Sequence, residues 1–216
     1  MQDVIEIIID KDLVFQHKKD FSILLAIHDR CGAKCEWETS TYLIDNLKCL
    51  DNRSLANITG LSMNTVRKYT KGYATTYQRS GPFALLPRPT YQRLLEETRS
   101  LTAAEKNGVI RTFCYFVCMC WSFQDFSRSV ENIAKELDNK ICDVSRRINW
   151  LVEHGFIYIK RHQINFPGQD KHPRVYQLYV DEVPANYIHT DWWAFHLAAR
   201  ETQTVDSILD NFKNSF

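Results

Sequence analysis

The first fifty positions carry a strand pattern followed by a helical one. Positions 4–9 are β-branched apart from one glutamate and end at Asp10-Lys11, which predicts a short strand and then a turn. Between positions 18 and 30, apolar residues recur every three or four places, which predicts a helix. Positions 39–50 fit both periods, because their leucines suit a helix and their threonines and tyrosine suit a strand. Helix and strand both remain open there.

Two short helical segments follow. The first covers positions 53–59, and Gly60-Leu61 then interrupts the apolar period. Ser62 can cap the next helix by accepting a backbone N–H, and that helix is expected to continue to about Tyr73. The pattern predicts two helices joined by a tight turn.

Proline and glycine punctuate the next stretch. The apolar run 83–86 lies between Gly81-Pro82 and a Pro-Arg-Pro sequence at 87–89, so we expect an edge strand, a candidate wing, because proline cannot donate to a sheet. The polar residues 96–100 come soon after. We place a linker between two domains near residues 94–101.

A long apolar helix is predicted to open the second half. Thr102 and Glu105 have the spacing of a capping box, and the helix should run to about Phe123. Apolar residues lie on most of its sides, so it should be central and buried. They are Val109, Ile110, Phe113, Phe116, Val117 and Trp121.

Two further helices and a hairpin complete this half. Ser129 caps a predicted helix at 129–137, residues 138–140 form a turn, and a third helix spans 141–154. Gly155 follows where a helix often ends in a left-handed residue. Strands are expected at 156–159 and 174–180, on either side of a polar loop at 160–173.

Both halves resemble known DNA-binding folds. Residues 54–69 are similar to the helix-turn-helix signature, with Ala56 where the helices cross, Gly60 in the turn, and buried Val66 and Tyr69. Residues 133–157 resemble the winged-helix pattern, although Asp138 replaces the usual turn glycine. The arrangement is similar to that of plasmid and phage replication initiators and of tandem winged-helix transcription regulators.

The resemblance implies a fold class and a domain organisation. The fold is expected to be mainly α with small β-wings (α+β), built as two winged-helix domains in tandem. The domains would cover residues 1–97 and 98–182. Residues 183–216 would form an aromatic, acidic, helical C-terminal tail.

Charge is distributed unevenly along the chain. The net charge is only +1, but residues 51–93 contain seven cations against Asp51 alone, whereas the tail from Asp181 is acidic. Local charge guides partner choice more than the total does. The first domain is therefore expected to contact nucleic acid. Its cations are Arg53, Arg67, Lys68, Lys71, Arg79, Arg88 and Arg93.

The expected DNA contacts fall on the second helix of each helix pair and on the second wing, with Arg53 added from the first helix of the first pair. In this arrangement the exposed residues near the start of a recognition helix reach base edges, and nearby cations hold phosphates. Asparagine suits adenine and arginine suits guanine. The first domain offers Arg53, Ser62, Asn64, Thr65, Arg67, Lys68 and Lys71. The second offers Lys140, Ser145, Arg146 and Arg147 on its helix and Lys160, Arg161, Lys171 and Arg174 in its wing.

Other classes of function find little support in the sequence. It has no phosphate-binding glycine loop, nucleophile elbow or nuclease-like carboxylate cluster, so we expect no enzyme and no cofactor. No apolar run reaches the roughly 20 residues of a membrane helix, and no signal peptide opens the chain. We expect a cytoplasmic protein with reduced cysteines.

Two features leave alternatives open. The donors His28, Cys31, Cys35 and Cys49 could hold zinc, but their spacing is not a familiar zinc signature, and we predict no metal. The aromatic segment around Trp192, Trp193 and Phe195 either packs back on the second domain or docks a protein partner, including a second copy.

The function predicted from these features is sequence-specific binding of double-stranded DNA. The protein would control transcription or replication of a mobile genetic element, a plasmid or a phage. The alternative is a winged-helix scaffold for protein-protein interaction that does not bind DNA.

Overall fold

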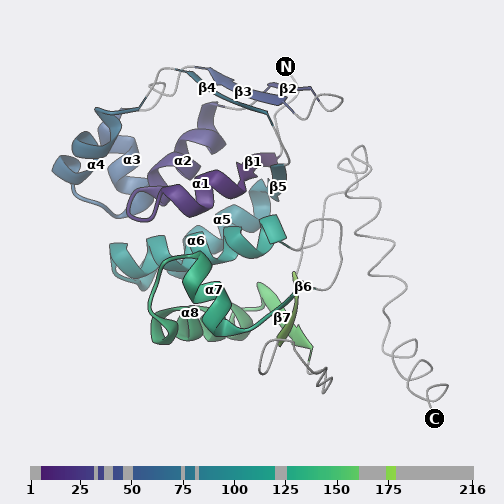
Figure 1. The fold of residues 1–216 in the computed structure, drawn as a ribbon. Coiled ribbons are helices and arrows are strands. Elements are labelled where there is room, and N and C mark those ends of the chain that lie inside the picture. Colours follow the sequence, from purple (N-terminus) through teal and green to yellow (C-terminus); the bar gives the residue numbers. More distant parts are fainter. Residues whose placement is uncertain are drawn as a thin grey trace, which may run out of the picture.

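The computed structural model describes residues 6–31, 34–36, 41–45, 51–73, 76–80, 83–119, 126–160 and 174–178. Within these ranges the protein is mainly helical, with eight α-helices and three small antiparallel sheets (Figure 1). The mainly α part of the predicted fold class is therefore confirmed. No helix among the described residues has the length and apolar character needed to cross a membrane.

The chain begins with a strand and two helices. They are β1 (Glu6–Asp10), α1 (Lys11–Gln16) and α2 (Phe21–Cys31). The strand is confirmed over its described part, but the predicted turn at Asp10-Lys11 is wrong. The Asp10 carboxylate accepts a hydrogen bond from the backbone N–H of Leu13, with 2.6 Å between N and O, and so caps α1. The helix predicted between positions 18 and 30 is α2, which begins at Phe21.

The ambiguous stretch 39–50 is a strand where it is described. Two short strands are present, β2 (Lys34–Glu36) and β3 (Thr41–Asp45). The strand β3 lies between β2 and the later strand β4 (Thr76–Ser80) in a three-stranded antiparallel sheet. Because β3 pairs on both edges, its backbone hydrogen-bonding groups have partners. The spacing of its leucines did not indicate this pairing.

The predicted pair of short helices is confirmed. They are α3 (Asn52–Thr59) and α4 (Met63–Thr70). Gly60 ends α3 with a left-handed φ of 73°, a conformation that costs glycine little. The Ser62 hydroxyl accepts a hydrogen bond from the N–H of Thr65 and caps α4. The second helix ends at Thr70, three residues before the predicted end.

The strand predicted at 83–86 forms, but not as a wing. As β5 (Phe83–Pro87) it pairs with β1 in a two-stranded antiparallel sheet, with Ile8 opposite Leu85. Ala84, Leu85 and Leu86 are all buried. A wing projects into solvent, whereas β5 lies in the core. The wing assignment is therefore wrong for this strand.

The predicted linker is also wrong. Residues 94–100 fall within α5 (Arg88–Glu97) and the 3₁₀ turn η1 (Thr98–Ser100), and Leu101 caps η1. Leu94 and Thr98 are fully buried, and the Thr98 hydroxyl donates to the Leu94 carbonyl at 2.6 Å. Of the polar residues 96–100 that suggested a linker, four are exposed, and only Thr98 is buried. The domain boundary at residue 97 stays a prediction.

The long helix α6 (Ala103–Met119) is central, as predicted. It runs between α1, α2 and β1 on one side and α7 and α8 on the other (Figure 1). The Thr102 hydroxyl accepts from the N–H of Glu105 at its start. Five of the six apolar residues named for this helix are buried; Trp121, like the predicted end at Phe123, lies outside the described residues.

Polar side chains of α6 bind backbone groups of α3, of α2 and of the turn before α2. Lys106 donates to the Ile58 carbonyl in α3, with 2.8 Å between N and O. Asn107 accepts from the N–H of Ser22 and donates to the carbonyl of Lys18. Helix ends leave backbone groups without intrahelical partners, and these side chains satisfy several of them. Lys106 and Asn107 therefore join neighbouring elements instead of facing solvent.

Arg111 is the most buried cation of α6, with 3% of its surface exposed. Its guanidinium donates to the carbonyls of Val14, at 2.6 Å, and Phe15 in α1, and to the carbonyl of Leu137 after α7. Burial, together with the nearby Arg147 guanidinium, lowers the pKa of Arg111 to about 10. Arg111 thus stays charged at neutral pH and links the two halves of the chain.

The second half follows the predicted order with one added strand. Its helices are α7 (Val130–Glu136) and α8 (Ile141–Glu153), and its strands are β6 (Phe126–Arg128), β7 (Ile157–Lys160) and β8 (Arg174–Leu178). The strands form an antiparallel sheet in the order β6-β8-β7. The three-residue β6 was not predicted, because only its pairing with β8 distinguishes it from a loop.

The turns around α8 also follow the predictions. Ser129 caps α7, and Gly155 takes a positive φ of 69° after α8. Asp138, which stands where the pattern usually has glycine, adopts a φ of 46°. Aspartate tolerates this left-handed conformation better than most residues do. The turn thus keeps its geometry without glycine.

The two halves share one hydrophobic core. A continuous cluster of buried side chains extends from β1 and α2 through α6 to α8 and β8. A second, smaller cluster joins α2 to the α3–α4 pair and includes Ile27, Leu55 and Val66. The α3–α4 pair is therefore anchored to the body of the protein through α2.

The cysteines differ in state. Cys114 and Cys118 are free and buried, and Cys142 is free and exposed. Cys31 is disulfide-bonded, so the expectation that every cysteine is a reduced thiol is wrong at this residue. Among the described residues, no three or more His, Cys, Asp or Glu side chains are grouped as a metal site would require.

Buried His28 predicts that stability depends on pH. Its Nδ1–H donates to the Ile8 carbonyl at 3.0 Å, and burial lowers its pKa from the ordinary 6.5 to about 4. Nearby Asp10 opposes this shift and His17 adds to it. A lowered pKa in the folded state means that the unfolded chain takes up the proton first. Stability is then fully present above pH 6.5 and is lost as the pH falls toward 4.

We expect the free energy of unfolding to fall by about 2 to 3 kcal/mol between pH 6.5 and about 4.5 through this group. Urea unfolding at both pH values measures the fall. A His28→Gln variant can keep the hydrogen bond to Ile8 but cannot titrate, so its fall should be smaller by that amount. An equal fall in both proteins would show that His28 does not control this dependence.

Candidate nucleic-acid interface

The helix α4 presents one side to solvent because its other side is anchored. Val66 is fully buried against Leu55 of α3 and the side chains of α2. The Thr70 hydroxyl donates to the Asn52 side chain at 3.1 Å, which holds the end of α4 beside the start of α3. This bond brings Arg53 and Lys71, the next residues along the chain, to the same end of the helix pair.

Four cations lie exposed on this pair, and we call them the basic face: Arg53, Arg67, Lys68 and Lys71. None of them forms an ion pair within the described part of the chain. Asn64 is also exposed and precedes Arg67 and Lys68 by three and four positions, so it shares their side of the helix. The face therefore combines free positive charge with one amide.

The hydroxyls of Ser62 and Thr65 already form contacts within the protein. The Ser62 hydroxyl accepts the capping N–H of Thr65 and lies 2.9 Å from the Thr65 hydroxyl. Asp51, the acid of this segment, similarly accepts from the N–H of Ser54, which lowers its pKa. Both groups position the helices. Of the residues predicted in this half, the basic face and Asn64 are the ones left available.

Two cations that contributed to the charge count have structural roles. Arg88 forms an ion pair with Asp29, with 2.6 Å between Nε and Oδ1. Arg93 donates to the carbonyls of His154 and Gly155 at the end of α8, and its guanidinium lies 4.2 Å from the centre of the Phe156 ring. Fewer positive charges of this segment are therefore available at the surface than its sequence suggests.

The predicted cations of α8 mostly contact other residues of the protein. Arg146 is exposed, but it pairs with Asp143 at 3.3 Å and with Glu105 at 3.5 Å. Arg147 is partly buried and lies across α6, where a Cβ on Gly108 would approach its guanidinium to 2.4 Å. Burial lowers the pKa of Arg147. Lys140, just before the helix, is exposed.

The predicted wing cations are described only in part. Lys160 ends β7 and Arg174 begins β8, and these strands pair with Lys160 opposite Val175. The two positions thus lie at the same end of the hairpin. Arg161 and Lys171 lie outside the described residues, as do Trp192, Trp193 and Phe195 of the tail.

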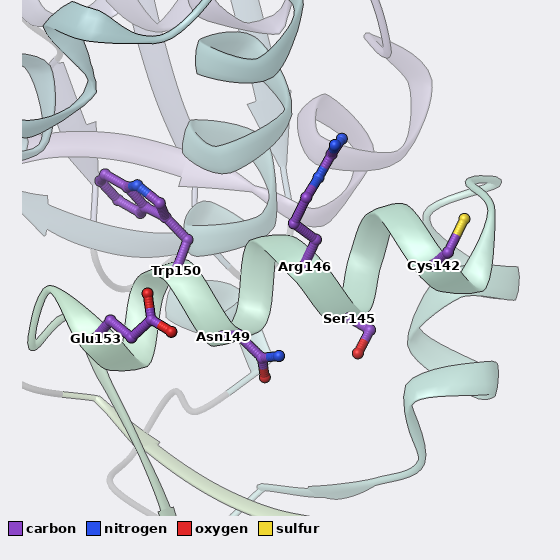
Figure 2. A pocket seen from close by; sticks show the side chains of 6 residues that line it. All are labelled: Cys142, Ser145, Arg146, Asn149, Trp150 and Glu153. Atoms are coloured by element: carbon purple, nitrogen blue, oxygen red, sulfur yellow. The ribbon is translucent and has the colours of Figure 1, made fainter.

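The exposed side of α8 contains residues that the sequence reasoning missed. A hollow of about 500 Å³ lies on this helix, and its described lining comes entirely from α8. Figure 2 shows the six side chains that line it. Cys142 and Asn149 line it together with the predicted Ser145. Ile141, at the start of the helix, is 51% exposed. These neutral side chains were not predicted because the prediction was based on cations. Their spacing of three and four positions places them on one side of the helix and could have identified them.

Searches for related proteins returned no match among protein-family models, curated proteins or solved structures. The resemblance to winged-helix proteins therefore rests on the residues and topology of this chain.

Proposed function

We propose that the protein binds double-stranded DNA in a sequence-specific manner through two winged-helix units in tandem. The observation that carries this proposal is the α3–α4 pair. Its caps and left-handed Gly60 fix the angle between two helices, and its exposed side carries four cations that form no ion pair with a described residue. Free cations on a recognition helix supply the phosphate contacts on which affinity for DNA depends.

The second half supports the proposal through its topology. Three helices, α6, α7 and α8, are followed by the paired strands β7 and β8, which is the winged-helix order. The inner side of α8 is buried through Val144, Ile148 and Leu151, so its outer side is free to enter a groove. The first half has the helix pair but pairs β5 with β1, so the two units are unequal.

A role in controlling transcription or replication of a plasmid or phage is part of this proposal. It rests on the resemblance in arrangement stated above. The two roles predict different DNA sites, because an initiator binds repeated direct sites near an origin and a dimeric regulator binds a palindrome near a promoter.

Selection of bound fragments from a genomic library tests sequence specificity. The full chain should enrich fragments that share a recurring motif. Fragments without a common motif would contradict sequence-specific binding. Recovery of no DNA at all would favour the alternative, a scaffold that binds proteins.

A further inference from the structure

The outer side of α8 carries both signs of charge around its hollow. Figure 2 shows Arg146 and Trp150 along one edge of this hollow and Ser145 and Asn149 along the other. Arg146 and Glu153 are both exposed, so the described lining has no excess of positive charge. Phosphates require such an excess. The hollow therefore suits a protein segment better than the backbone of a nucleic acid.

The hollow is open on one side within the described part of the chain. Its described lining comes from α8 alone, and its volume is about 500 Å³. The side chains of one helix can border a hollow of this size but cannot close it, because the helix surface is convex. Ile141 lies next to Cys142 at one end of the hollow and is 51% exposed. A second surface is therefore needed to cover this side of α8.

The chain that follows β8 begins near one end of this hollow. Leu178, the last residue of β8, pairs with Ile157 of β7, which follows Glu153 by four positions. The 13 residues of α8 extend about 20 Å. The chain from Leu178 to Trp192, fourteen positions later, can span about 46 Å. Residues 191–195 can therefore reach any point of the hollow within one molecule.

The sequence of residues 191–195, Asp-Trp-Trp-Ala-Phe, complements this lining. Arg146 pairs with Asp143 at 3.3 Å and with Glu105 at 3.5 Å through its terminal nitrogens, which leaves the planar face of the guanidinium for an aromatic ring. Tryptophan is the best such partner for a cation. Tryptophan and arginine are also the side chains that most often contribute strongly to the energy of protein interfaces. A tryptophan of this segment thus fits against Arg146.

We propose that residues 191–195 dock in the hollow of the same molecule, with Trp192 or Trp193 against Arg146, and so cover the outer side of α8. The inference rests on the proposed function, because the docked segment and a DNA groove compete for the same side of this helix. The basic face of α3 and α4 stays open. DNA therefore contacts the basic face first, and α8 reaches DNA only after the segment is displaced.

Disulfide trapping tests the docking in the full chain, because Cys142 is a free, exposed thiol in the lining of the hollow. Ala194→Cys places a second thiol inside the docking segment, and Ala185→Cys places one outside it as the matched control. Under mild oxidation the thiol at position 194 should link to Cys142 about 10-fold faster than the thiol at position 185, because docking raises its effective concentration. Peptide mapping by mass spectrometry measures both rates.

Two outcomes of the trapping would overturn the inference. Equal linkage rates at positions 194 and 185 would show that the segment does not dock. A link between two molecules, seen as a dimer on a non-reducing gel, would assign the hollow to a second copy of the chain. Adding Trp192→Ala and Trp193→Ala to Ala194→Cys should lower the rate to that of the control, and an unchanged rate would show that these rings do not hold the segment.

Duplex affinity tests the competition with DNA. The linked Ala194→Cys protein should bind a duplex about 10-fold more weakly than the same protein after reduction, since the link removes the open state. Wild-type protein taken through the same oxidation and reduction is the control, because Cys31 is also disulfide-bonded. Equal affinities of the linked and reduced proteins would overturn the competition. If neither protein binds any duplex in either state, the proposed function fails, and the linkage rates still decide whether the segment docks.

Discussion

Replacement of Arg67, Lys68 and Lys71 together by glutamine is expected to weaken duplex binding by a factor on the order of 10² to 10³ at about 0.1 M salt. These cations are exposed and have no ion pair within the described residues. Each phosphate contact contributes roughly 0.9 to the slope of log affinity against log salt. Loss of three contacts should therefore reduce the slope by about 2.7.

Fluorescence anisotropy of a labelled duplex over a salt series measures both quantities. A matched control removes the same charge elsewhere, by Lys11→Gln, Lys19→Gln and Arg99→Gln. These cations are exposed and lie outside α3, α4 and α8. The control should change affinity much less than the α4 variant does. Equal losses in the two variants would mean that overall charge, rather than the basic face, controls binding.

Arg111→Met is expected to lower the free energy of unfolding by about 3 kcal/mol. The substitution removes the guanidinium that binds the carbonyls of Val14, Phe15 and Leu137. Methionine fills part of the volume but donates no hydrogen bond, so the carbonyls of Val14 and Phe15 lose this donor, while the Leu137 carbonyl still accepts from the Asn139 amide at 3.0 Å. A buried polar group without a partner costs more than the net gain of an average hydrogen bond.

Urea unfolding measures this change, and Arg99→Met is the matched control. Arg99 is exposed in η1, and an exposed substitution of this kind should change stability by no more than about 0.5 kcal/mol. Arg111→Lys should fall between the two variants, since it keeps the charge but not the forked geometry. A loss below about 1 kcal/mol in Arg111→Met would show that water replaces the guanidinium at these carbonyls.

Features that depend on neighbouring residues in the sequence were predictable. The cap at Ser62, the turn at Gly60 and the helix end at Gly155 each follow from local chemistry, and all three are present. The buried stripe of α8 followed from its period of three and four residues. Such signals involve only the helix itself and the residues beside it.

Features that depend on distant pairing were not predictable. The polar residues at 96–100 suggested a linker because the buried Leu94 and Thr98 were not recognised as one helix face. The pairing of β5 with β1 joins segments about 75 residues apart, and no local pattern indicates it. The hydrophobic period and the composition of a segment do not show which distant strand it pairs with.

The candidate site shows the same division. The cations of α4 were predicted correctly as exposed, because they lie away from the buried Val66 on the same helix. Arg147 was grouped with them by residue type, yet the structure places it across α6 at Gly108. Asn149 was missed because cations received more weight than amides. Asn149 is exposed, whereas Arg146 pairs with Asp143 and Glu105 and Arg147 packs across α6.

The central claim is that the exposed cations of the α3–α4 pair bind the phosphates of duplex DNA. The most direct test is the equilibrium affinity of the wild-type chain for a duplex between about 50 and 200 mM salt. Four phosphate contacts predict a log-log slope of about −3.6 or steeper, which is a loss of roughly 100-fold or more across this range. No binding at the lowest salt, or an affinity that stays constant as salt rises, would contradict the account.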